Sequence, residues 1–548
     1  MPITGAATRG DPDADLEGAL ADWRRFRRRS RLQDLHWIDA LYQAYLAALL
    51  SGVAILAAAS IVGDKAVSTA GVAQVRADGA AWIGCLAAAA VGLGLRSGSR
   101  GGPLALERAD VRHALLSPVD RVTALRSPAL HQLRFLCFVA AVAGATAGHL
   151  ADRRLPGNGV AWTVCGTVTL VVIAVLAHGA ACCAAGLRLR PWLAAILAVA
   201  LAGWAVADAL GAAPSSPGAV VGRLTLWPLH VDLVGLVPVS LAGVVAVAGL
   251  RLLGGLSLEQ LERRSRLVGQ LRFAATLQDL RTVVVLRRQL AQERPRNHPW
   301  FRPPLPERLL PVFTRDARSL LRWPAGRLAR LVTVGALGGL AARAAFDGTT
   351  PFIVLAGVAF FVASLDAAEP LGQELDHPTL RDSVPAPAGW LYVRHLPAIA
   401  GVAIATAAIG AVAAVLVDPR PGAWPVALVC VVPAGLGAAA GAVVNLVMGA
   451  PEVAGSSWSL VPPEAAGMRL VARTAFPPAM ATLGLVPVLT ARAALDGGRS
   501  AVDGAIGTVG PLVAVFVLTC GWVRLRDDIK AWWRGQMEQA FPAREETS

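Results

Sequence analysis

Long apolar runs, separated by short segments rich in arginine, dominate this chain. About twelve of the runs are long enough to cross a bilayer, because a helix needs roughly 20 apolar residues to span the hydrocarbon. Lipid offers no partners to unpaired backbone groups, so runs of this length indicate helices rather than strands. The predicted spans are 42–63, 79–95, 131–150, 159–186, 191–211, 231–253, 330–346, 351–369, 394–417, 423–449, 475–496 and 501–524. The pattern therefore predicts an all-α polytopic membrane protein.

The spans fall into two sets of six, and the two sets share short sequence echoes. Pro103-Leu104-x-x-Glu107 recurs as Pro370-Leu371-x-x-Glu374, at an offset of 267 residues. Leu32-Gln33-Asp34-Leu35 recurs as Leu277-Gln278-Asp279-Leu280. A recurring offset is typical of duplicated units, and many transporters are built from two related halves. We therefore predict two pseudo-repeated six-helix halves, each preceded by a cytoplasmic helix.

The polar segments divide the chain into five predicted regions. These are an N-terminal cytoplasmic and interfacial segment (1–41), a first six-span half (42–253), a basic cytoplasmic connector (254–329), a second six-span half (330–524) and a C-terminal cytoplasmic tail (525–548). The N-terminal segment has an apolar stripe beside arginines, which is typical of a helix lying on a membrane surface. The connector opens with the capping-box spacing of Ser257 and Gln260 and is broken by prolines from Pro295 onward.

Composition supports the membrane assignment. Hydrophobic residues make up 55% of the chain and charged residues 16%, whereas soluble proteins carry about a quarter charged residues. The net charge of +14 would suit a nucleic-acid binder. However, the arginines gather in segments that lie on one side of the membrane by span parity, which favours the positive-inside rule. We expect a multi-pass protein of the plasma (inner) membrane with both termini cytoplasmic, in contact with the lipid bilayer and with no nucleic acid.

The sequence carries no recognisable catalytic or metal-binding motif. A P-loop needs G-x-x-x-x-G-K-[ST], and neither lysine of the chain, Lys65 or Lys530, stands in that context. The nine histidines are scattered, and the seven cysteines lie inside apolar runs. We therefore predict that the chain is not an enzyme, has no catalytic residues or metal site, and binds no cofactor directly.

Polar residues inside the spans are candidates for a transport pathway. Ion-coupled carriers usually place ionisable groups near the membrane midplane. His178 is the deepest such group, Asp208 lies near the outer end of its span, and Asn445 lies in the tenth span. His178 could relay protons or simply hydrogen-bond a neighbouring helix, and Asn445 could hold two helices together.

The loop after the second span of each half is the stronger functional candidate. In the first half, Glu107, Arg108, Asp110 and Arg112 predict a short charged helix that ends at Ser117-Pro118. Its counterpart in the second half is Glu374, Asp376, His377 and Pro378. Such an element could dock into a soluble subunit and transmit its movement to the spans. The alternative is an ordinary polar connector.

Several phrases resemble the ABC-2-type permeases, the membrane subunits of ABC exporters. Leu115-Leu-Ser-Pro-Val-Asp-Arg121 and Glu374-Leu-Asp-His-Pro378 are similar to the coupling loops of that family, and Arg188-Leu-Arg190-Pro191 to its short inner turn. Thr276–Arg281, Arg287–Glu293 and Leu321–Pro324 resemble a poorly characterised actinobacterial family of fused twelve-span permease-like proteins. The resemblance implies a separate ABC-type ATPase, in two copies, that binds the ATP. It also implies that this chain is a fused pseudo-dimer, and it does not imply a substrate.

The leading hypothesis is therefore the permease subunit of an ATP-driven exporter. Two alternatives stay open. One is an ion-coupled secondary transporter that uses His178 or Asp208. The other is a non-transporting membrane scaffold whose basic connector recruits cytoplasmic proteins or anionic lipid.

Overall fold

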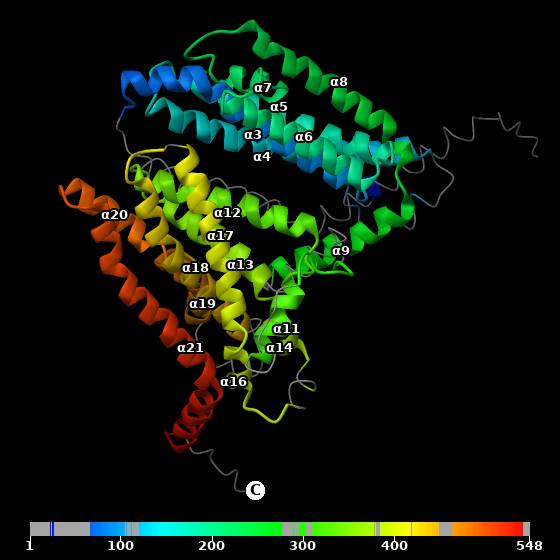
Figure 1. The fold of residues 1–548 in the computed structure, drawn as a ribbon. Helices are drawn as coiled ribbons and strands as arrows, with labels where there is room; N and C mark the ends of the chain where they lie inside the picture. Colours follow the sequence, from blue (N-terminus) through cyan, green and yellow to red (C-terminus); the bar gives the residue numbers. More distant parts are fainter. Residues whose placement is uncertain are drawn as a thin grey trace, which may run out of the picture. The chain divides into compact units, whose positions relative to one another are not determined.

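All the regular secondary structure in the described part of the chain is helical (Figure 1). The computed structural model describes residues 66–104, 106, 111, 115, 120–276, 286, 289, 295–302, 310–377, 379, 384–417, 419–448 and 463–540, together with Asp22, Arg25 and Phe26. No strand occurs within these residues. The predicted span 42–63 and most of the predicted N-terminal helix lie outside them.

Nine helices of the described part are long and apolar enough to cross a membrane, or up to eleven if each of two bent pairs forms one span. The nine are Thr69–Gly98, Arg121–Asp152, Gly159–Gly186, Pro191–Ala209, Leu233–Gly255, Ala325–Phe346, Ala388–Val417, Ala423–Met448 and Ala501–Ile529. The bent pairs are Phe352–Ala367 with Glu369–Asp376, at 57°, and Arg473–Leu483 with Val486–Asp496, at 48°. The prediction of a multi-pass helical membrane protein is confirmed, whereas the count of twelve spans stays a prediction.

The chain forms two compact units, Met1–Gln270 and Leu271–Ser548. The boundary lies inside the predicted connector, within helix α9 (Leu258–Thr276). The pseudo-repeat between the two halves stays a prediction.

Unit 1 is built around α5 (Gly159–Gly186), which contacts α3 (Thr69–Gly98), α4 (Arg121–Asp152), α7 (Pro217–Thr225) and α8 (Val237–Arg251). The remaining elements are α6 (Pro191–Ala209), η2 (Leu233–Leu236) and η3 (Leu252–Gly255). Asn158 accepts a hydrogen bond at the start of α5, and Asp120 and Ser216 do so at α4 and α7, as side chains at helix N-termini commonly do.

Unit 2 is built around α18 (Ala423–Met448). In its apolar stretch, which is long enough to cross a membrane, 61% of the residues are buried. It contacts α13 (Phe352–Ala367), α14 (Glu369–Asp376), α17 (Leu396–Val417), α19 (Pro463–Leu483), α20 (Val486–Asp496) and α21 (Ala501–Ala540). The other helices are α11 (Pro311–Leu320), α12 (Ala325–Phe346) and α16 (Ala388–Val393). Helices α12 and α17 cross where Gly339 meets Gly410, and a Cβ atom on Gly339 would collide with the Gly410 carbonyl. Small residues permit this approach, as is usual between membrane helices.

Candidate functional site

A partly buried charged cluster joins four helices and an adjoining turn at one end of unit 2. We define the charged cluster as eight residues: Arg315, Asp316, Arg327, Arg330, Asp366, Glu369, Glu374 and His395. They come from α11, α12, α13, α14 and the turn that precedes α17. Four of them are buried, namely Asp316, Arg327, Asp366 and His395. A charge inside a membrane protein is costly unless it is paired and hydrogen-bonded, so these buried groups point to a specific role.

Arg327 holds α12 to the bend between α13 and α14. Its guanidinium lies 2.6 Å from a carboxylate oxygen of Glu369 and donates to the backbone carbonyl of Asp366 at 2.7 Å. The same guanidinium stacks 4.0 Å from the ring centre of Trp323. One buried side chain therefore connects both helices of the bent pair to α12.

Arg330, one turn later on α12, binds the same region. Its Nε and Nη2 atoms donate to Oδ2 of Asp366 at 3.1 and 2.8 Å. The Asp366 residue is 2% exposed. The carboxylate is therefore enclosed by protein, and Arg330 supplies the positive charge that compensates it.

A second half of the charged cluster connects α11 to α14 and α17. Nδ1 of His395 donates to Oδ2 of Asp316 at 2.6 Å, and both side chains are almost completely buried. Nε2 of His395 lies 4.0 Å from Oε2 of Glu374, and that oxygen accepts a hydrogen bond from Arg315 at 3.1 Å. Glu374 therefore lies between a buried imidazole and a half-exposed guanidinium.

The local sequence explains why these charges converge. Pro311 and Pro370 occupy first-turn positions of α11 and α14, where the missing N–H is tolerated. Pro370 cannot extend the hydrogen-bond ladder of α13, and the pair bends by 57°. In α14, Leu371 and Gly372 are buried, whereas Asp376 and His377 are exposed. The bend thus turns a span into a short surface helix with a buried face and an exposed end.

The predicted second-half docking residues take two different positions. Asp376 and His377 lie exposed at the end of α14. Glu374 is instead turned inward, with its side chain 12% exposed and paired with Arg315. Pro378 lies outside the described residues.

The first-half docking residues Glu107, Arg108, Asp110, Arg112, Ser117 and Pro118 all lie outside the described residues. Their apolar neighbours are described: Leu104, Val111 and Leu115 are buried in a cluster that includes residues of α4, α5 and α9. The side-chain amide of Gln132 also donates to the carbonyl of Pro103 at 2.9 Å, and Ser265 donates to the carbonyl of Leu106. The described residues of this segment are therefore anchored to unit 1 by apolar packing and by hydrogen bonds to two backbone carbonyls.

The predicted pathway residues lie apart from the charged cluster. His178 is buried within α5, with Nε2 at 3.6 Å from the sulfur of Cys182 on the same helix. Asn445 is half-buried in α18. His178 and Asn445 therefore have the positions of residues that pack within a helix bundle.

Asp208 lines a polar pocket of about 360 Å³ in unit 1, together with Arg76, Arg223, His230 and Asp232. The carboxylate accepts a hydrogen bond from the backbone N–H of Ser216 at 2.6 Å. Asp232 accepts hydrogen bonds from the Val234 N–H and from Arg223, and these bonds hold its pKa below the usual value. The pocket therefore combines positive and negative groups beside the start of α7.

Sequence reasoning missed most of the charged cluster. Arg327 and Arg330 contribute to the arginine bias beside a span, and Asp316 and His395 are separated by 79 positions. One available signal was Asp366 at the end of an apolar run, because a carboxylate there needs a cationic partner. The pattern does not identify that partner.

The charged cluster links α11, α12, α13 and α14 through ion pairs and hydrogen bonds. No group of three or more potential metal ligands occurs in the described part of the chain. Searches against family models, curated proteins and solved structures return no match for this chain. The functional argument therefore depends on the residues and their geometry.

Proposed function

We propose that this chain is the membrane-spanning subunit of an exporter that is driven by a separate ABC-type ATPase. The observation that carries the proposal is α14, a short helix with an exposed charged end and a buried face tied by ion pairs to α11 and α12. A displacement of α14 would pull on both helices through Arg315 and Arg327. Rigid elements that link a docking surface to packed helices are a common route for such transmission.

The proposal places the charged cluster on the cytoplasmic side of the plasma membrane. Arg327 and Arg330 at this end of α12 contribute to the arginine bias that favours that orientation. Both termini would then be cytoplasmic. The exposed end of α14 would face the compartment that holds ATP.

The energy source in this proposal is a partner protein. The sequence contains no P-loop, so ATP would be bound and hydrolysed by two copies of an ATPase subunit. One copy would dock at α14 and the other at the segment that contains Glu107 to Pro118. A single chain carrying both docking elements would act as a fused pseudo-dimer.

The test is a native pull-down of the tagged full-length chain in mild detergent, with mass spectrometry of the proteins retained. We expect a P-loop ATPase in stoichiometric amounts. The double variant Asp376→Arg, His377→Glu should lose it, because the charges at the exposed end of α14 are reversed or replaced. The matched control is Asp496→Arg, at an exposed position at the end of α20.

The ATPase should remain bound to the Asp496→Arg variant. A folded preparation that retains no P-loop ATPase would contradict the proposal. It would favour the ion-coupled carrier or the scaffold, and His178, Asp208 and the 254–329 connector would become the next targets. Retention by both variants would leave the ATPase partnership intact and remove α14 as its docking site.

A further inference from the structure

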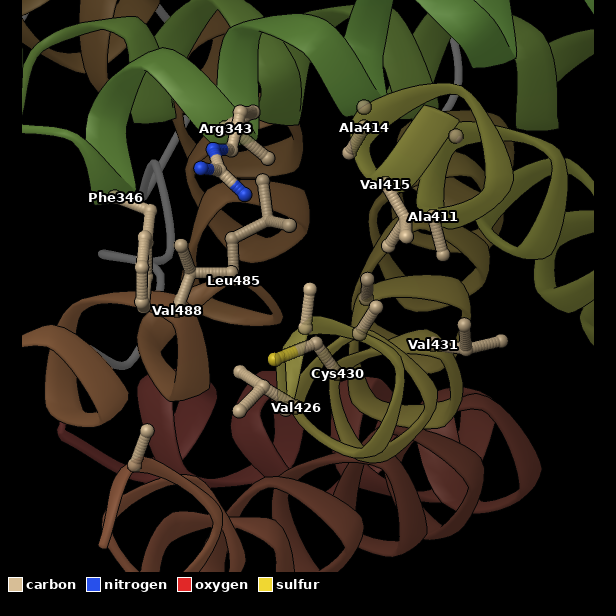
Figure 2. Close-up of a pocket in the computed structure, with 18 of the residues that line it drawn as sticks. Arg343, Phe346, Ala411, Ala414, Val415, Val426, Cys430, Val431, Leu485 and Val488 are labelled. Atoms are coloured by element: carbon tan, nitrogen blue, oxygen red, sulfur yellow. The ribbon is translucent and has the colours of Figure 1, made fainter. Parts of the chain in front are cut away.

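Unit 2 contains an apolar cavity of about 390 Å³ between α12, α13, α17, α18, α20 and α21 (Figure 2). It is separate from the charged cluster and lies toward the opposite end of α12. Its walls are mostly aliphatic and aromatic, including Phe346, Phe360, Val426, Leu485 and Val488. Ligand sites in proteins typically enclose about 300–1,000 Å³ and are lined mainly by apolar side chains, so this cavity has suitable size and character.

Two arginines line the cavity, and no carboxylate does so among the described residues. Figure 2 shows the guanidinium of Arg343 pointing into the cavity beside Leu485. Arg343 donates to Oδ2 of Asp347 at 2.7 Å, and Arg420 donates to Oδ1 of the same carboxylate at 3.2 Å. One carboxylate is thus shared by two guanidinium groups at the edge of an apolar chamber. The Arg343 side chain is 12% exposed and the Arg420 side chain is 57% exposed, so an anion at the open edge of the cavity would meet positive charge from both.

We propose that this cavity binds an amphiphile with one acyl chain and an anionic headgroup. The tail would lie between α17 and α18, against Ala411 and Ala414, and the headgroup would contact Arg343 and Arg420. The volume lies near the lower limit for ligand sites, which favours one chain over the two chains of a bilayer phospholipid. Arginine suits the headgroup because its planar donors match carboxylate and phosphate oxygens.

The binding site stands independently of the ATPase, whereas its role as the cargo site rests on the proposed function. Under that proposal, the cavity would receive an anionic amphiphile as the exported substrate. Binding of an amphiphile to the isolated chain therefore tests the site, and the pull-down tests the partnership with an ATPase. Failure of one experiment is distinguishable from failure of the other.

The experiment measures binding of a doxyl-labelled stearate to the full chain in phosphatidylcholine nanodiscs by electron paramagnetic resonance. An alkaline buffer keeps the stearate ionised. We expect a saturable immobilised signal that unlabelled stearate displaces. The uncharged methyl ester should bind about tenfold more weakly, because it lacks the charge that the arginines recognise.

Two kinds of variant separate the tail from the headgroup. Ala414→Phe and Val426→Trp should each abolish the saturable signal by filling the cavity. Val412→Phe is the matched control, because Val412 lies on the same helix as Ala414, is 42% exposed and does not line the cavity. Arg420→Gln should weaken stearate about tenfold and leave the methyl ester unchanged. The unfolding temperature of each variant shows whether it is folded.

Three outcomes would overturn the proposal. An immobilised signal that does not saturate, or that survives both cavity-filling variants in folded protein, would mean that the label reports lipid around the protein. Equal binding of stearate and its methyl ester would remove the headgroup assignment. Tighter displacement by a phosphatidylglycerol than by stearate would replace the single-chain amphiphile with a bilayer phospholipid.

Discussion

Leu104 of unit 1 and Leu371 of unit 2 occupy the same position in the Pro-Leu-x-x-Glu echo, and both are buried in apolar clusters, but α14 is also held by ion pairs. In unit 1, Leu104 and its apolar neighbours pack into a cluster with residues of α4, α5 and α9. In unit 2, α14 is held through Glu369 and Glu374, which pair with Arg327 and Arg315. Both leucines therefore anchor the echo by apolar packing, and unit 2 adds charged contacts at Glu369 and Glu374, whereas Glu107 lies outside the described residues.

The distinction matters because apolar contacts and ion pairs respond differently to changes in salt, protonation and geometry. Apolar packing weakens gradually and depends little on salt, whereas ion pairs depend on protonation, salt and geometry. An ion-paired joint can also exchange partners when a helix moves. The contacts of Leu104 are apolar, and those of α14 are both apolar and charged; four substitutions compare the two kinds of contact in order of decreasing expected effect.

The largest effect is expected for Arg327→Leu. The substitution removes the ion pair to Glu369, the bond to the Asp366 carbonyl and the stacking on Trp323. Breaking a buried pair by removing one partner typically costs about 3–5 kcal/mol. Thermal unfolding in detergent, followed by tryptophan fluorescence, measures the loss.

The control for Arg327→Leu is Asp496→Asn. It removes the pair with Arg492, in which the Asp496 side chain is 72% exposed, and such pairs contribute less than about 1 kcal/mol. Equal stability of the two variants would contradict the view that charge anchors α14.

The next effect is expected for Leu104→Ala in unit 1. Leu104 is 1% exposed within an apolar cluster, and leucine-to-alanine changes in cores cost about 2–5 kcal/mol. The loss should be the same at low and high salt, because apolar contacts are not screened by salt. Leu93→Ala serves as the control because Leu93 is 68% exposed on α3. A strong salt dependence of the Leu104→Ala effect would contradict the view that apolar packing anchors Leu104.

A smaller effect is expected for Ser265→Ala. The change leaves the carbonyl of Leu106 without the hydroxyl that bonds it, and an unsatisfied buried carbonyl costs about 1–3 kcal/mol. Hydrogen exchange of the amides around Leu106 should accelerate. Thr333→Ala is the control, because that exposed hydroxyl bonds a carbonyl of its own helix. Unchanged exchange in the Ser265 variant would show that the bond does not hold the segment.

The smallest effect is expected for Glu374→Gln, because its partner Arg315 is 56% exposed. We expect a coupling of about 0.5–1 kcal/mol between Glu374 and Arg315 in a double-mutant cycle, decreasing as salt is added. Such a weak contact would let the end of α14 move while Arg327 holds its base. A coupling above about 3 kcal/mol would instead make α14 rigid along its whole length.

The sequence predicts the helical membrane fold well because apolar length is a local property. The predicted run 159–186 coincides with the helix Gly159–Gly186, and 423–449 differs from Ala423–Met448 by one residue. The prediction is less accurate at 351–369, which the structure divides between α13 and the start of α14. There Pro370 interrupts the hydrogen-bond ladder although the apolar pattern continues almost to that point.

The candidate site was only partly predictable. The short helix containing Glu374 and Asp376 follows from its charge pattern, whereas the inward position of Glu374 depends on Arg315 and His395. Those partners are distant in sequence, and hydrophobic periodicity carries no information about which charges will meet. The cavity could not be predicted from the sequence either. Small residues such as Gly410 and Ala411 look like ordinary packing positions unless the arrangement of the helices is known.

The most direct test of the account is site-specific photocrosslinking from α14 in intact membranes. A benzoylphenylalanine placed at His377 samples the exposed end of α14, and the same group at Asp496 samples an exposed position elsewhere in unit 2. The account predicts that His377 crosslinks to a P-loop ATPase and that Asp496 does not. If His377 gives no ATPase adduct in cells that express the folded chain, or if both positions give the same products, α14 is not the docking helix of an ATP-driven permease.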